Sequence, residues 1–181
     1  MKILHVSESD NIGGAAIAAS RLNTLLLSFG IDSKLLVNRK KSGDSNIIAP
    51  TTFINLIYAK LLPHFLLRYY KLSLGTTTIS LCLNKSTPFF LNALKKESFD
   101  IIHLHWVNNG FVGFDELIKT NKPIVWTLHD NWLFTAGCHI TQDCVGFLSS
   151  CESCPKLPSY SYQIILNQNF EKKFNQLQKL K

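Results

Sequence analysis

The sequence predicts an α/β fold in which a parallel sheet is flanked by helices. Two observations predict this class: short apolar segments rich in β-branched residues alternate with segments of helical periodicity, and the strongest apolar segments run directly into polar or glycine-bearing loops. The length of 181 residues fits one domain, or one domain with a fragment of another. A hydrophobic content of 46% with only 17% charged residues excludes a largely disordered chain.

The expected elements follow one another as strand, glycine-rich turn, helix and strand over the first 40 residues, which is a βαβ unit. Residues 2–7 (KILHVS) predict a buried strand, and apolar residues at helical spacing predict a helix over 15–29 that ends at Gly30. The remaining expected elements are a strand at 33–38, helices at 53–72 (with a break at Pro63), 87–96 and 114–119, strands at 100–106 and 123–128, an irregular segment at 131–160 and a basic amphipathic helix at 162–181.

Polar residues at the carboxyl ends of the predicted strands are candidates for a ligand site, because open parallel sheets bind ligands there. Gly13 and Gly14 open a helix directly after a strand. A helix N-terminus has free N–H groups, and glycine lets an anion approach them. A tight turn without a ligand is an equally good interpretation. The pattern matches neither the dinucleotide-binding motif nor the P-loop.

Histidines follow the other two strong strands. His103 and His105 alternate and are expected on one face, with His103 packed in the core and His105 near enough to the strand end to reach a ligand. His129 could donate or accept a proton near neutral pH, and Asp130 could orient it or cap the segment that follows. A surface histidine in an Asx-type turn is the alternative.

Four cysteines, spaced C-x5-C-x6-C-x2-C, are concentrated in the irregular segment. They are Cys138, Cys144, Cys151 and Cys154. Four thiolates could bind a structural zinc ion, and free thiols or a redox pair are the alternatives. Four sulfur ligands would leave no open position for catalysis.

A formal charge of +7 favours anionic partners. No nucleic-acid recognition motif is present, so we expect no nucleic-acid partner. Lys60, His64, Arg68 and Lys71 form a basic stripe on a predicted helix, either for an anionic membrane surface or as an ordinary solvated face. The sequence shows neither a secretory leader nor a membrane span, which indicates a cytoplasmic protein with reduced thiols.

Five segments together resemble the N-terminal half of a family 4 glycosyltransferase, especially bacterial enzymes of capsule, exopolysaccharide or lipopolysaccharide-antigen synthesis. The segments are KILHVS, GGAAIAASRL, DIIHLHWVNNGF, PIVWTLHDNWLFTAGCH and CESCP. The resemblance covers nearly the whole chain and is weakest over residues 53–98. It implies a GT-B architecture, in which two Rossmann-like domains face each other across a cleft. Residues 1–181 would be the acceptor-side domain, itself incomplete, without the C-terminal donor-binding domain.

The resemblance implies transfer of a sugar, with retention, from a nucleotide-sugar donor to a saccharide acceptor, often lipid-linked at the cytoplasmic face of the membrane. No metal is required for that chemistry. By resemblance, Gly13 and Gly14 lie near the donor phosphates, His129 lies at the transfer centre with Asp130 beside it, and His105 and Asn109 lie on a neighbouring loop of the cleft.

One departure from the family limits these expectations, because the Glu-x7-Glu motif of the C-terminal domain is absent. We therefore expect this chain alone to be inactive and to need a C-terminal half in trans. A non-catalytic remnant, or a partner subunit that binds acceptor or membrane, is the alternative.

Overall fold

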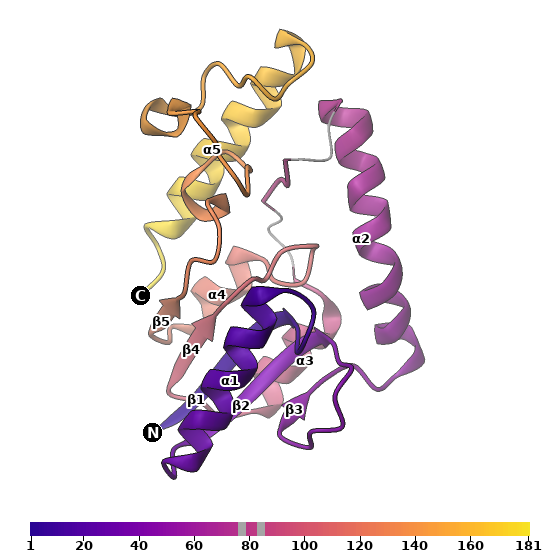
Figure 1. Ribbon diagram of the computed structural model, residues 1–181, viewed down its shortest axis with the longest axis vertical. Helices are drawn as coiled ribbons and strands as arrows, with labels where there is room; N and C mark the ends of the chain where they lie inside the picture. The colour runs from indigo at the N-terminus through magenta and orange to yellow at the C-terminus, as the bar shows by residue number, and fades with distance from the viewer. Residues whose placement is uncertain (76–78, 83–85) are drawn as a thin grey trace.

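The computed structural model describes residues 1–75, 79–82 and 86–181. Within them, five parallel strands form one sheet in the order β3-β2-β1-β4-β5 (Figure 1). The strands are β1 (Lys2–Ser9), β2 (Asp32–Arg39), β3 (Ile47–Ile48), β4 (Ile101–Leu104) and β5 (Ile124–Trp126). The predicted α/β class with a Rossmann-like parallel sheet is therefore confirmed.

Alternate residues of the sheet pack on opposite faces. On one face, α1 (Gly14–Ser28) places Ala19 against Leu35 and Val37 of β2. On the other, Val6 and Ile102 pack with α3 (Pro88–Lys96) and α4 (Phe114–Thr120) in the larger core cluster. Figure 1 shows this layering, with α1 on one side of the strands and α3 and α4 on the other.

Two further helices lie outside this sandwich (Figure 1). The first, α2 (Phe53–Leu74), continues through Pro63, so the expected break is absent, and it ends at Gly75 with a left-handed φ of 68°. The second, α5 (Gln163–Leu177), packs Leu166 against the cysteine-bearing segment. That segment is irregular, as predicted, with short 3-10 helices at Trp132–Phe134, Gly146–Ser149 and Tyr160–Tyr162.

The strand boundaries differ from the sequence-based expectation at the carboxyl ends. β4 ends at Leu104 and β5 at Trp126, although single backbone hydrogen bonds continue beyond them, from His105 N to Val6 O and from Thr127 N to Leu104 O. The chain after each strand therefore stays attached to the sheet while it turns away. β3 was not expected, because two residues are too short for any periodicity to show.

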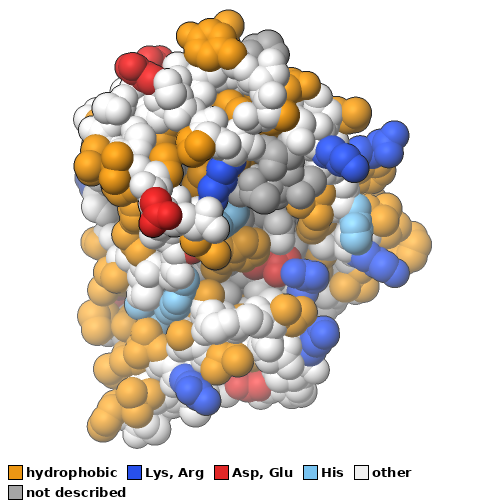
Figure 2. All heavy atoms as spheres, turned by 45° about the horizontal axis from the view of Figure 1, so that its top comes forward, with side chains coloured by type: hydrophobic (Ala, Val, Ile, Leu, Met, Phe, Trp, Pro, Cys, Tyr) orange, Lys and Arg blue, Asp and Glu red, His pale blue; other side chains and the backbone are white. Residues whose placement is uncertain are grey.

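The described helices include none with the length and apolar character needed to cross a membrane. The basic stripe on α2 is present in the structure, and Figure 2 shows basic side chains with a histidine among them along the side of the molecule where α2 runs. Many apolar side chains of α2 remain exposed beside it, including Phe53 and Phe65 at 79% and 66%.

Candidate functional site

The carboxyl ends of β1, β4 and β5 surround a cleft of about 500 Å³. Its lining includes Gly13 and Gly14 from the start of α1, Trp106 and Asn109 from the loop after β4, and His129 from the loop after β5. Three loops that are far apart in the sequence therefore meet in one concave site. This is the position in which an open parallel sheet binds its ligands.

The glycine turn provides an uncapped helix N-terminus in this cleft. Gly13 has φ 84° and ψ 166°, a conformation that is essentially restricted to glycine, and its carbonyl accepts the first hydrogen bond of α1 from Ile17 N. Among the residues that the structure describes, no side chain caps α1, and its first turn contains no acidic residue. A Cβ on Gly14 would meet nothing within 4 Å. The cleft thus offers free backbone N–H groups and a partial positive charge to an anion.

An ion pair that the sequence analysis missed forms another wall of the cleft. Arg39 donates from Nε to Glu8 Oε1 at 2.8 Å and from Nη2 to Glu8 Oε2 at 2.7 Å, and both residues line the cleft. Glu8 is buried, and burial raises its pKa despite the nearby guanidinium. The signal for this pair was hidden because the predicted strand covered residues 2–7 only, whereas β1 continues to Ser9 and includes Glu8.

Histidine rings form a connected row from the sheet to the cleft. His5 Nδ1 lies 3.3 Å from His105 Nε2, and His105 Nδ1 lies 3.1 Å from His129 Nε2. Burial, reinforced by the neighbouring histidines, lowers the pKa of His105 to about 3, and burial lowers that of His5 to about 4. Both rings are therefore neutral at neutral pH. His129 is exposed at the cleft end of the row.

The row of histidine rings places His105 behind His129 and not at the surface of the cleft. His105 is only 3% exposed and is absent from the lining of the cleft, so it lies behind His129. Its carbonyl oxygen accepts a hydrogen bond from Trp126 Nε1 at 3.0 Å. His105 therefore reaches the cleft through the ring of His129, and a direct contact of its own with a ligand stays a prediction.

His103 is also placed differently from the sequence-based expectation of a packed core histidine. It is half-buried, and its Nε2 lies 2.7 Å from the Thr127 hydroxyl. It pairs in register with His5 on the neighbouring strand β1. His5, His103 and His105 each offer one ring nitrogen within 4.8 Å of the others, so this group could hold a metal ion. His5 in KILHVS was the overlooked signal, because adjacent parallel strands align it with His103.

Asp130 is held by hydrogen bonds on the side of the cysteine-bearing segment. Its Oδ1 accepts from Trp132 N at 2.9 Å, and its Oδ2 accepts from Trp106 Nε1 at 2.8 Å and lies 2.7 Å from His139 Nδ1. Burial tends to raise the pKa of Asp130, but these hydrogen bonds outweigh it and lower the pKa. The bond from Trp132 N is that of the Asx-type turn, the alternative interpretation, and the 3-10 helix that follows Asn131 has no side-chain cap among the described residues. A catalytic role of Asp130 stays a prediction.

His139 extends this network, and the sequence analysis did not select it. Its Nε2 lies 3.0 Å from Ser80 Oγ, which ties residues 79–82 to the loop after β5. Trp132 Nε1 donates to the Ser80 carbonyl at 2.8 Å, and the Trp132 ring lies under Lys173 Nζ at 4.2 Å. The network fixes the loop that follows His129 and thereby positions one wall of the cleft.

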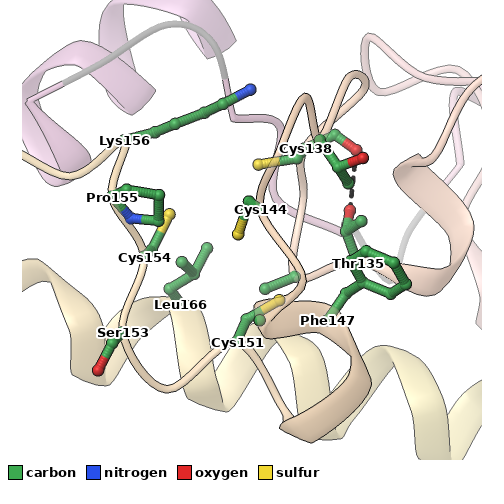
Figure 3. A pocket seen from close by; sticks show the side chains of 13 residues that line it. Thr135, Cys138, Cys144, Phe147, Cys151, Ser153, Cys154, Pro155, Lys156 and Leu166 are labelled. Carbon is green, nitrogen blue, oxygen red and sulfur yellow. Dashed lines mark hydrogen bonds between the residues drawn. The ribbon is translucent and has the colours of Figure 1, made fainter.

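All four cysteines of the predicted zinc site line a second, small cavity of about 20 Å³ (Figure 3). That volume is comparable to the space of a single water molecule. A hydrogen bond between two of the thiols lowers the pKa of Cys154 to about 6 and raises that of Cys138. Among the described residues, the group of three or more possible ligands gathered closely enough to hold a metal ion is the histidine group and not these thiols. Zinc at the cysteines stays a prediction.

Comparison with known proteins gives one partial similarity. Over 66 residues, the chain is 41% identical to a protein of Escherichia coli (strain K12) named "Putative colanic acid biosynthesis glycosyl transferase WcaC". The matched stretch covers 34% of this chain and 16% of the length of that relative. No family model and no solved structure matches the chain. Part of the sequence is therefore similar to a glycosyl transferase of polysaccharide biosynthesis.

Proposed function

We propose that this chain is the acceptor-side lobe of a glycosyltransferase in cell-surface polysaccharide synthesis. The observation that carries the proposal is that the glycine turn at the start of α1 and His129 line one cleft. The partial similarity to the E. coli glycosyl transferase and the resemblance of the motifs support the same activity. The reaction moves a sugar from a nucleotide-sugar donor to a saccharide acceptor, with retention at the anomeric carbon.

The glycine turn and the loops after β4 and β5 each have a role in this proposal. The free N–H groups of α1 attract the donor phosphates, and Gly13 and Gly14 allow their close approach. His129, held through its Nε2 by His105, presents its ring to the transferred sugar. Asp130 fixes the loop that carries His129, and Asn109 faces the same cleft from the loop after β4.

A second lobe is part of the proposal, because the resembling enzymes hold the donor mainly with their C-terminal domain. The cleft described here is open and would form one side of such a site. We therefore propose that this lobe alone binds donor weakly and that transfer requires a C-terminal lobe, supplied in trans or within a longer protein. The sugar transfer itself needs no metal ion.

The surface of α2 favours a second candidate function, the binding of a membrane or of a lipid-linked acceptor without catalysis. Its basic stripe lies beside exposed apolar side chains such as Phe53 and Phe65. Basic and apolar groups on one helix are the combination that binds anionic lipid surfaces. In the catalytic proposal, the same surface brings the enzyme to the cytoplasmic face of the membrane, where the lipid-linked acceptor lies.

The test combines the purified chain with a separately expressed C-terminal part of the E. coli relative. Release of nucleotide from UDP- and GDP-sugars is measured in vesicles that contain lipid-linked saccharide. We expect release only with both parts present, and a loss of at least about 100-fold in His129→Ala. Lys122→Ala, exposed between α4 and β5 and outside both the cleft and the basic stripe of α2, is the matched control. Vesicle binding without release in any combination would favour the non-catalytic function.

A further inference from the structure

His5, His103 and His105 bring three ring nitrogens close enough together to hold a metal ion. A zinc ion with nitrogen ligands at about 2.0–2.1 Å sets neighbouring ligand atoms about 3.3–3.4 Å apart. His5 Nδ1 and His105 Nε2 are 3.3 Å apart, and one nitrogen of His103 completes the group within 4.8 Å. We propose that these three histidines bind a zinc ion.

The ring of His5 has one nitrogen paired with His105 and one nitrogen left without a partner among the described residues. His5 is fully buried, and its Nε2 has no hydrogen-bond partner in the described structure. A buried polar atom without a partner is costly, and such atoms are rare in native proteins. The three imidazoles therefore gather around a buried ring that hydrogen bonds satisfy only in part.

The protonation state of the group supports metal binding. A histidine must be neutral to act as a ligand. Burial keeps His5 and His105 neutral, with pKa values of about 4 and 3, and it also lowers the pKa of His103. No carboxylate or thiolate belongs to the group. A site of three neutral imidazoles suits zinc and the neighbouring transition metals, but not magnesium or calcium.

The surroundings provide a path for the ion and support for its ligands. Thr127 is exposed and lies 2.7 Å from His103 Nε2, so the group opens to solvent across β4 and β5. Three protein ligands would leave a fourth position for water. When His105 Nε2 binds the ion, its Nδ1 carries the proton and donates to His129 Nε2 at 3.1 Å. The ion would thereby fix the tautomer of His129.

The proposal does not depend on sugar transfer, and it differs from zinc at the cysteines in its ligand atoms. The absorption spectrum of bound cobalt(II) distinguishes the histidine site from the cysteine site, because thiolate ligands add a charge-transfer band that imidazole ligands lack. The full chain is reduced, stripped with EDTA and titrated with CoCl2, then with ZnCl2. We expect one ion per chain that gives visible bands without a thiolate band and is displaced by zinc.

Substitutions identify the ligands. His103→Gln is expected to lower the affinity for cobalt and zinc more than 10-fold, and Thr127→Val about 10-fold, through loss of the hydrogen bond that orients the ligand. His64→Gln, on α2, is the matched control and is expected to bind as the parent chain does. Binding unchanged in His103→Gln, or a thiolate band as the sole signal, would overturn the proposal.

A measurement on the parent chain covers the case in which a substituted chain does not fold. The imidazole resonances are followed by NMR during a zinc titration. We expect those of His5, His103 and His105 to shift together up to one equivalent, while those of His64 stay in place. Resonances of the three rings that do not move would contradict the zinc site.

Discussion

Replacing Gly13 and Gly14 separately by alanine is expected to move stability in opposite directions. Gly13 has φ 84° and ψ 166°, and forcing alanine into this conformation costs about 1–3 kcal/mol. A Cβ would meet no atom within 4 Å at either glycine, so neither substitution adds a clash. At Gly14, which opens α1 without a positive φ, alanine reduces the entropy of the unfolded chain and stabilises by about 0.4–1 kcal/mol.

The two free energies of unfolding should therefore differ by about 1.5–4 kcal/mol. Urea denaturation followed by far-UV circular dichroism resolves this, because a slope of about 1–3 kcal/mol/M turns 2 kcal/mol into a midpoint shift of roughly 1 M. Gly43→Ala is the control, since a Cβ there also meets nothing within 4 Å and Gly43 does not line the cleft.

Both substitutions place a methyl group in the lining of the cleft. Each should therefore slow the release of nucleotide from the nucleotide sugar by the two-part enzyme. Gly14→Ala is the more informative, because lost activity there would accompany unchanged or increased stability. Equal urea midpoints for Gly13→Ala and Gly14→Ala would refute the conformational argument. Full activity in Gly14→Ala would refute the phosphate-binding role of the turn.

Three further predictions follow from buried groups. In EDTA, the free energy of unfolding should fall by up to about 2 kcal/mol per histidine between pH 7 and pH 5. Burial lowers the pKa of His105 to about 3 and that of His5 to about 4, so the unfolded chain binds protons at a higher pH than the folded chain does. Urea midpoints that do not change between pH 7 and pH 5 would contradict this prediction. At pH 7, iodoacetamide should modify Cys154 long before Cys82, because the pKa of Cys154 is lowered to about 6 and burial raises that of Cys82 to about 12. Peptide mass spectrometry gives the order of modification. Gly137→Ala should cost roughly 2–4 kcal/mol, because its Cβ would lie 2.7 Å from a backbone carbonyl oxygen, and an unchanged urea midpoint would exclude that contact.

The parallel sheet could be predicted from the sequence because its signals are local. KILHVS is apolar and β-branched, the helix after it repeats every three to four residues, and Gly30 follows its end. The continuation of α2 through Pro63 was not predictable in this way, since proline normally interrupts a helix. The short β3 carries no periodicity at all and exists because it pairs with β2.

The candidate site was only partly predictable, because its contacts join distant segments. The position of Gly13 and His129 at strand ends follows from the general behaviour of parallel sheets. The row of histidine rings depends instead on the register that aligns His5 with His103, which the sequence does not reveal. The bond between Asp130 and His139 likewise depends on how the irregular segment folds back.

All three tryptophans of the chain lie around the strand ends. Trp106 lines the cleft, Trp126 donates to the His105 carbonyl, and Trp132 lies beneath Lys173. Selectively excited tryptophan fluorescence therefore observes this end of the sheet, since α2 contains tyrosines but no tryptophan. An emission change that precedes the loss of helical ellipticity would show that the ligand-facing edge opens before the rest of the molecule.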